Sequence, residues 1–278
     1  MLEALEAAEP GVHVGSGGFR VDRERALRTL MSYQLPDARA FLLPWLRLAA
    51  ASGATRVAVA PLWRGLELRF DGEPLSAERL KDPFACLFSS EREPRYIHLV
   101  AGLLAVLKLE PSRIAIASGR ERRFQLEIEG LKRESLTEDR GGEETTLRVH
   151  WAGWLSLGKT RECLERALLA CGLYPAGLII AGRLPLRPVE LSYPLAFDAH
   201  GVRGRLGLLA AGAIESGIAV YKLGVRVTEL RRALSGRQVR AHVNDDALEL
   251  TASQSGVLAD DRLARLLAVV ETQAQALR

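Results

Sequence analysis

The stretch of residues 41–60 constrains the fold of this chain more than any other. Its first part, residues 41–51, has apolar side chains at helical spacing, and Gly53 follows as a stop signal. Residues 56–60 then have the composition of a strand. Pro44 removes one backbone donor, so we expect either a kinked helix over residues 38–51 or a helix that begins near Pro44. The stretch therefore predicts a helix, a tight turn and a strand in close succession.

Composition places the chain among folded proteins with substantial cores. It has 278 residues, of which 48% are hydrophobic, enough for one large or two ordinary domains. The net charge of +4 permits an acidic partner such as nucleic acid, although a solvated surface is the simpler interpretation. No secretory signal and no apolar run long enough for a membrane span is evident.

The cysteines indicate a reducing environment. Cys86, Cys163 and Cys171 are odd in number and have no Cys-x-x-Cys spacing. We interpret them as small core residues of a cytoplasmic protein, and not as zinc ligands. The histidines are scattered, so we expect no metal site.

Hydrophobic periodicity predicts helices and strands along the whole chain. Helices are expected at residues 22–33, 77–88, 96–107, 157–172 and 260–277. Strands are expected at residues 56–60, 66–70, 113–117, 122–129 and 145–151, with a polar loop at 134–144 and a short hairpin at 178–186. After a proline- and arginine-rich stretch at 183–188, strands are expected at 189–196, 202–209, 218–223, 239–243 and 247–250. We therefore expect an α+β fold with two domains, residues 1–185 and 186–278.

The opening stretch resembles the first motif of the GHKL ATPase superfamily, which includes gyrase B, the MutL mismatch-repair proteins and the ninety-kilodalton heat-shock chaperones. In that family the helix carries E-L-x-x-N-x-x-D-A before Gly-Ala-Thr. Aligned on Gly53-Ala54-Thr55, the general-base Glu falls on Pro44, the magnesium-holding Asn on Leu48 and the Asp on Ala51. Pro and Leu can neither accept a proton from water nor hold Mg²⁺. The resemblance thus implies the family's frame without its hydrolytic chemistry.

Two further fragments resemble the family's adenine site. Asp71-Gly72 stands where the family has D-x-G-x-G, whose Asp receives the adenine amino group, although a β-turn that ends a strand is the simpler interpretation of the pair. Thr146 stands where the family's G-T-x-V-x-V strand supplies a Thr, although a β-branched residue in a strand is the alternative. The resemblance implies Asp71, Gly72 and Thr146 as candidate nucleotide contacts. No cofactor is expected to be required, and ATP binding without hydrolysis stays open.

The lid and the second half depart further from the family. The family's lid is glycine-rich, whereas residues 89–98 contain no glycine, and Arg92 and Arg95 lie among acids. Gly102 is expected to allow close packing of its helix on the sheet. Residues 201–225 resemble the ribosomal-S5-type transducer domain, in which Lys222 matches no motif and receives no role.

Two other patterns offer alternatives. Residues 153–160 satisfy G-x-x-x-x-G-K-[ST], but the preceding stretch is amphipathic, so we favour a chance match over a phosphate-binding loop. A basic cluster that permits nucleic-acid contact is formed by Arg226, Arg231, Arg232, Arg237 and Arg240. Nearby acids, Glu229, Asp245 and Asp246, favour a solvated mixed face instead.

Taken with the resemblance, the sequence predicts a two-layer GHKL-like (Bergerat-type) α/β sandwich followed by a smaller S5-like α+β domain. The predicted function is a non-hydrolysing protein-interaction or scaffold module with a protein partner, without a membrane partner, and with homo-oligomerisation left open. The alternative is a nucleotide-dependent ATPase or an ATP-binding chaperone-like protein.

Overall fold

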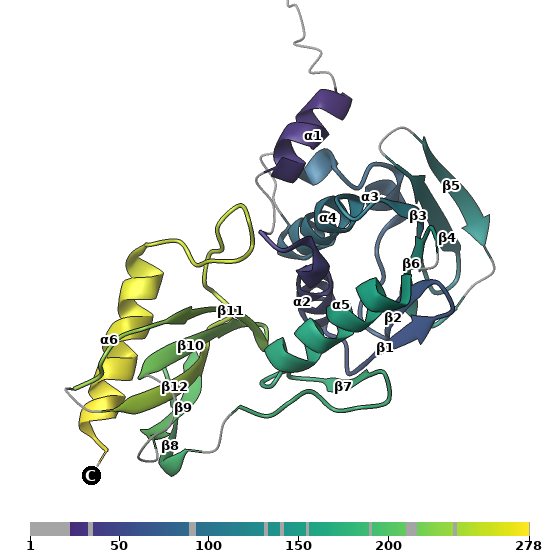
Figure 1. The fold of residues 1–278 in the computed structure, drawn as a ribbon. Helices are drawn as coiled ribbons and strands as arrows, with labels where there is room; N and C mark the ends of the chain where they lie inside the picture. The colour runs from purple at the N-terminus through teal and green to yellow at the C-terminus, as the bar shows by residue number, and fades with distance from the viewer. Residues whose placement is uncertain are drawn as a thin grey trace, which may run out of the picture.

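The computed structural model of the chain is an α+β structure with a seven-stranded and a five-stranded sheet (Figure 1). It describes residues 23–32, 36–88, 93–130, 133–139, 142–153, 156–188, 191–209, 216–235 and 238–277. The expected lead-in at residues 11–19, the lid residue Arg92 and Arg237 of the basic cluster lie outside these ranges. The expectation of an α+β fold is confirmed.

The larger sheet is mixed, with strand order β5-β4-β3-β6-β2-β1-β7. Its strands are β1 Arg56–Leu62, β2 Gly65–Phe70, β3 Pro111–Ser118, β4 Arg123–Glu129, β5 Arg133–Asp139, β6 Thr145–Trp151 and β7 Gly177–Ile180. All neighbouring strands pair antiparallel except β1 and β7, which run parallel.

Helices cover one face of this sheet (Figure 1). They are α2 Leu42–Ala51, α4 Pro94–Leu107 and α5 Ser156–Ala170, with α1 Arg23–Ser32 and the short α3 Ala77–Lys81 beside them. Pro44 is the third residue of α2, so the expectation of a helix that begins near the proline is confirmed and the kinked helix is wrong. Gly53 follows with φ +68°, a conformation that favours glycine and lets the chain turn into β1.

The smaller sheet has the order β11-β10-β12-β9-β8. Its strands are β8 Ser192–Ala199, β9 Val202–Leu208, β10 Gly217–Lys222, β11 Val225–Leu230 and β12 Val239–Asn244. Helix α6, Asp261–Gln275, packs on one face, where Leu206, Val220 and Val243 meet Leu266 and Val270 in a separate core. None of the described helices is long and apolar enough to cross a membrane.

Three expected elements differ from the structure. The helix expected at residues 77–88 ends at Lys81, and a 3-10 turn at Ala85–Leu87 follows. The polar loop expected at 134–144 contains β5, which pairs with β4 at the sheet edge. The hairpin expected at 178–186 is instead β7 beside β1, with a single bridge between Ile180 and Arg183.

Two smaller expectations were also wrong. Residues 247–250 form no strand of the second sheet, and Leu250 makes only an isolated bridge with Val257. Gly102 allows close packing against another helix and not against the sheet. A Cβ at Gly102 would lie 2.2 Å from Nε1 of Trp45 on α2, so only glycine fits without movement.

Candidate functional site

Asp71 lies directly after β2, but its carboxylate points to the start of β1. Oδ1 accepts hydrogen bonds from the backbone N–H groups of Thr55 at 2.8 Å and Arg56 at 2.9 Å. Oδ2 accepts from Oγ1 of Thr55 at 2.7 Å and Nε of Arg56 at 3.1 Å. These bonds, first the backbone N–H of Arg56 and then the Thr55 hydroxyl, hold the pKa of Asp71 well below its usual range.

Gly72 is required by a close approach of two backbones. A Cβ at this position would lie 2.5 Å from the carbonyl oxygen of Ser52, at the end of α2. The next residue, Glu73, donates its N–H to the same oxygen at 2.7 Å. Asp71 and Gly72 together therefore fix the end of β2 against the turn between α2 and β1.

Thr146 lies on the sheet face that the helices leave uncovered. It pairs with the exposed Arg69 across β2, and its hydroxyl accepts from Nη2 of Arg123 at 2.7 Å. Thr145, its neighbour, points to the helical side beside Phe70. No hydrogen bond joins Asp71 to Thr146 in the described part of the chain, so the structure does not gather the candidate residues into one polar site.

The residues that were aligned with the GHKL catalytic motif, Pro44, Leu48 and Ala51, all have apolar side chains. Pro44 and Leu48 are buried, and Leu48 belongs to the core between α2 and the sheet. Ala51 is exposed at the end of the helix. None of the three side chains can coordinate a metal or exchange a proton.

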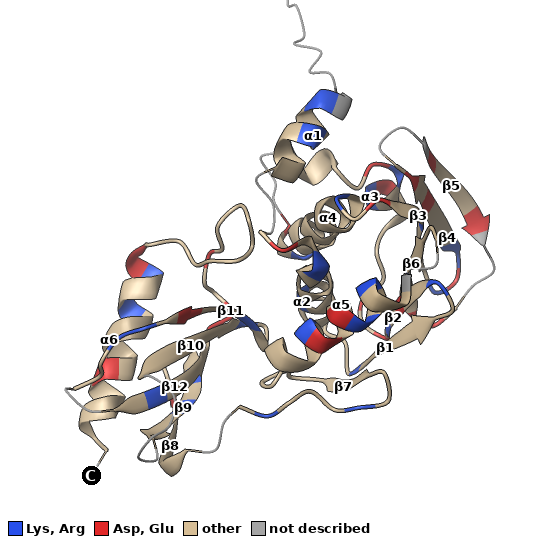
Figure 2. Cartoon of the chain, in the orientation of Figure 1, with Lys and Arg blue, Asp and Glu red and all other residues tan. Residues whose placement is uncertain are grey.

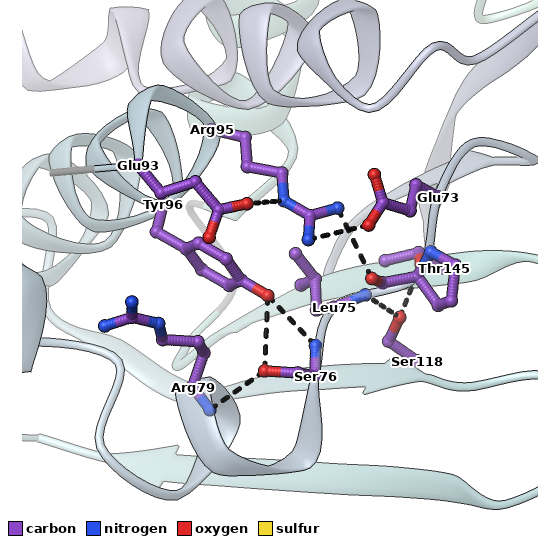
Figure 3. Close-up of polar contacts among 10 residues, drawn as sticks. Glu73, Leu75, Ser76, Arg79, Glu93, Arg95, Tyr96, Ser118 and Thr145 are labelled. Carbon is purple, nitrogen blue, oxygen red and sulfur yellow. Dashed lines mark hydrogen bonds and ion pairs between the residues drawn. The ribbon is translucent and has the colours of Figure 1, made fainter. Parts of the chain in front are cut away.

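The segment after Gly72 is fixed to the sheet and to α4 (Figure 3). The N–H of Leu75 donates to Oγ of Ser118 at 2.8 Å, and that hydroxyl shares a hydrogen bond with Thr145 at 2.6 Å. The N–H of Ser76 donates to the hydroxyl of Tyr96 at 3.0 Å. The side chains of Leu75 and Tyr96 are both buried in the core that this sheet shares with its helices.

Arg95 completes this network. Its guanidinium forms ion pairs with Glu73 and Glu93 and lies 5.0 Å from the ring centre of Tyr96 (Figure 3). The side chain is only 12% exposed. This arginine of the expected lid is therefore neutralised by acids of the same chain.

The stretch that matches a phosphate-binding loop is occupied by internal contacts. Its preceding strand, β6, pairs antiparallel on both sides, whereas such loops follow a parallel strand. Nζ of Lys159 donates to the carbonyl of Leu109 at 3.2 Å, and Thr160 accepts from Nε1 of Trp151 and donates to the carbonyl of Gly65. Trp154, inside the match, lies outside the described residues.

A buried polar cluster joins the two halves of the chain, and sequence patterns gave no sign of it. Arg47 on α2 is 1% exposed, and its Nη atoms donate to the carbonyls of Gln254 at 3.4 Å and Arg226 at 3.3 Å. Its Nε has no hydrogen-bond partner in the described part of the chain. Burial lowers the pKa of Arg47 to about 10.

His98 on α4 shares this cluster. The side-chain oxygen of Gln254 lies 3.3 Å from Nδ1 of His98. Burial, followed by the charges of Arg47 and Lys222, lowers the pKa of His98 to about 3. Gln254 therefore contacts Arg47 through its backbone carbonyl and His98 through its side-chain amide.

Lys222 is held within the second half. Nζ donates to the carbonyls of Asp246 at 2.9 Å and of Leu248, and burial lowers the pKa of the amine. Among the described residues, no group of histidine, cysteine and acidic side chains is arranged to hold a metal ion.

No protein-family model matches the chain, and no curated protein matches it.

Proposed function

We propose that the chain is a non-hydrolysing relative of the GHKL ATPases that acts as a protein-interaction or scaffold module. The observation that carries the proposal is the saturated carboxylate of Asp71. Four donors from Thr55 and Arg56 occupy its four acceptor positions, so none is left for an adenine amino group. The described residues therefore do not fit ATP in the family's manner.

Two further features of the chain support the proposal. Hydrolysis needs a proton acceptor and oxygen ligands for magnesium, and α2 offers Pro44, Leu48 and Ala51 at the corresponding positions. The free, buried thiols of Cys86, Cys163 and Cys171 fit a reducing cytoplasmic location.

The proposed partner surface is the edge of the larger sheet at β7 and the segment that follows it. This segment runs back toward the second sheet (Figure 1). The exposed apolar side chains are Ile179 on β7 and Leu184 and Leu186 in the following segment, and Leu184 is 72% exposed. Several exposed large apolar side chains in one segment are a feature of protein-interaction surfaces. We expect a protein partner here, with a second copy of the chain as one outcome of the test.

A binding experiment tests this surface. Leu184→Asp should abolish cross-links to the partner, or self-association measured by light scattering, because a charge would be buried in the contact. Phe88→Asp is the matched control, since Phe88 is 60% exposed and follows the 3-10 turn Ala85–Leu87, which packs on α4. Equal association of both variants with wild type would refute this surface.

A titration with ATP, with and without magnesium, tests the competing ATPase function. A ligand at about 100 times its dissociation constant stabilises a protein by about 2.7 kcal/mol, which raises Tm by several degrees. We expect no magnesium-dependent shift and no phosphate release. A shift that Lys159→Ala removes, or measurable turnover, would contradict the proposal.

Asp71→Asn separates the structural role from a nucleotide role. The amide has a single oxygen for the four donors, so the variant should lose about 1–3 kcal/mol of unfolding free energy. The control is Asp198→Asn on β8, an exposed carboxyl without a hydrogen bond to described residues. An Asp71→Asn variant as stable as wild type that loses ATP binding would favour the nucleotide function.

A further inference from the structure

The face of the smaller sheet opposite α6 carries several basic side chains. Alternation along the strands puts the apolar residues toward α6 and the polar residues on the other face. His242 on β12 pairs directly with Arg205 on β9, and Arg240 lies two residues before His242. Arg226 on β11 pairs with Tyr221 on β10, next to β12. Basic residues of β11 and β12 are marked in Figure 2.

Several nitrogen donors on this face have no hydrogen-bond acceptor among the residues that the structure describes. His242 is 3% exposed, and the hydroxyl of Tyr221 lies 3.5 Å from its Nδ1, while its Nε2 is buried without a partner. If Tyr221 donates to Nδ1, Nε2 carries the proton and is an unused donor.

The two half-buried arginines leave donors unused as well. Arg205 donates from Nη2 to the carbonyl of Pro188 at 3.3 Å, but its Nε is buried without an acceptor. The guanidinium of Arg226 makes no hydrogen bond or ion pair with any described residue. The buried donors among these, Nε of Arg205 and Nε2 of His242, are costly unless something accepts from them.

The charged groups that act on the His242 imidazole do not balance. Arg205, Arg226 and Arg240 carry three positive charges, and Glu229, which pairs with Arg240, carries one negative charge, so 3 − 1 leaves two positive charges around this residue. Burial, followed by the charges of Arg240, Arg205 and Arg226, lowers the pKa of His242 to about 4, in keeping with an electropositive site. The expectation of a solvated mixed face is wrong for Arg240, which is buried, and for Asp245, which is buried against Arg262.

We propose that this face binds a phosphate-class oxyanion through the guanidinium groups of Arg205 and Arg226 and the Nε2 donor of His242. A phosphate group carries close to two negative charges at neutral pH and accepts several hydrogen bonds, which matches the excess charge and the unused donors. A single carboxylate would neutralise only half of that charge. The site belongs to the second sheet and does not depend on the function proposed above.

Calorimetric titration of the full chain with inorganic phosphate at constant ionic strength tests the site. Wild type should bind, and Arg205→Gln should weaken binding about tenfold or more, the effect expected when a charge-assisted hydrogen bond is lost. Arg203→Gln is the matched control. Arg203 lies on the same strand two residues away, but its guanidinium already pairs with Asp246 at 3.0 Å, so its loss should change affinity less than about twofold.

A second arm identifies the source of the phosphate. The same variants are titrated with a short single-stranded oligonucleotide over a range of salt concentrations. Arg226→Gln is added to the set as a second variant of the site, in case Arg205→Gln fails to fold. Binding of the oligonucleotide alone, weakened by Arg205→Gln or Arg226→Gln but not by Arg203→Gln, would support the site with nucleic acid as its source. Absence of binding in both arms, or equal weakening by all three variants, would overturn the proposal.

Discussion

Acid should destabilise this protein through His98, a residue of α4, because its imidazole is buried in neutral form beside Gln254. The pKa of His98 is lowered to about 3, whereas an unfolded histidine titrates near 6.5. Because the pKa of His98 is lower in the folded state, the unfolded chain binds a proton on this residue at a higher pH than the folded chain does. The stability is therefore complete above about pH 6.5 and is lost as the pH falls from there toward 3.

The size of the effect follows from these two values. At pH 5 the unfolded state gains about RT ln 32, or roughly 2 kcal/mol, relative to a folded state in which His98 stays neutral. For a chain of this length that corresponds to a fall in Tm of about 4–8 °C. His242, with a pKa lowered to about 4, should contribute a separate loss of similar size at pH 5.

Urea unfolding at pH 8, 7, 6 and 5 measures the effect in wild type and in His98→Leu. The variant should lose some stability at pH 8, because its core packing and its contact with Gln254 change. Its loss between pH 8 and pH 5 should, however, be smaller than that of wild type by about 2 kcal/mol. Adding His242→Leu should flatten the pH dependence further. Parallel pH profiles of wild type and His98→Leu would show that the imidazole is not buried neutral.

Two other predictions concern packing and reactivity. Gly102→Ala should destabilise the protein by about 1–3 kcal/mol in urea unfolding, because the new Cβ would overlap Trp45. Gly158→Ala is the control on α5: a Cβ there would have nothing within 4 Å, so this variant should be neutral or slightly stabilising. An equal loss of unfolding free energy in both variants would argue against the contact with Trp45. Burial raises the pKa of both Cys163 and Cys171 to about 12, so their thiols should react with a thiol reagent only after unfolding. Rapid modification of native protein at pH 8 would contradict their burial.

Local signals in the sequence predicted the elements that depend on local chemistry. Proline at a helix start and glycine after its end located α2, and the alternation of Leu66, Leu68 and Phe70 located β2. These signals act within a few residues, so they do not depend on the rest of the fold.

Long-range pairing could not be predicted in the same way. Strand β7 was missed as a partner of β1 because the two segments are separated by more than a hundred residues and share no turn. Strand β5 was missed because most of its residues are polar, with Leu136 as the apolar exception, as suits an edge strand.

The prediction of the candidate site was limited because the sequence did not show which residues of β6 face the helices. Adjacent residues of a strand point to opposite faces, so a one-residue uncertainty decided whether Thr145 or Thr146 faced the helices. The sequence resemblance favoured Thr146, and the structure places it on the uncovered face. Likewise, Arg205 and His242 are distant in sequence, and only the pairing of β9 with β12 brings them together.

The position of Gln254 has a consequence for how the molecule unfolds. Its backbone has φ +57°, and it supplies acceptors to Arg47 and His98, two side chains from the other half of the chain. If the second half melted first, a buried guanidinium would lose both of its carbonyl partners at once. The two sheets should therefore melt together, as a single calorimetric transition, although each has a core of its own.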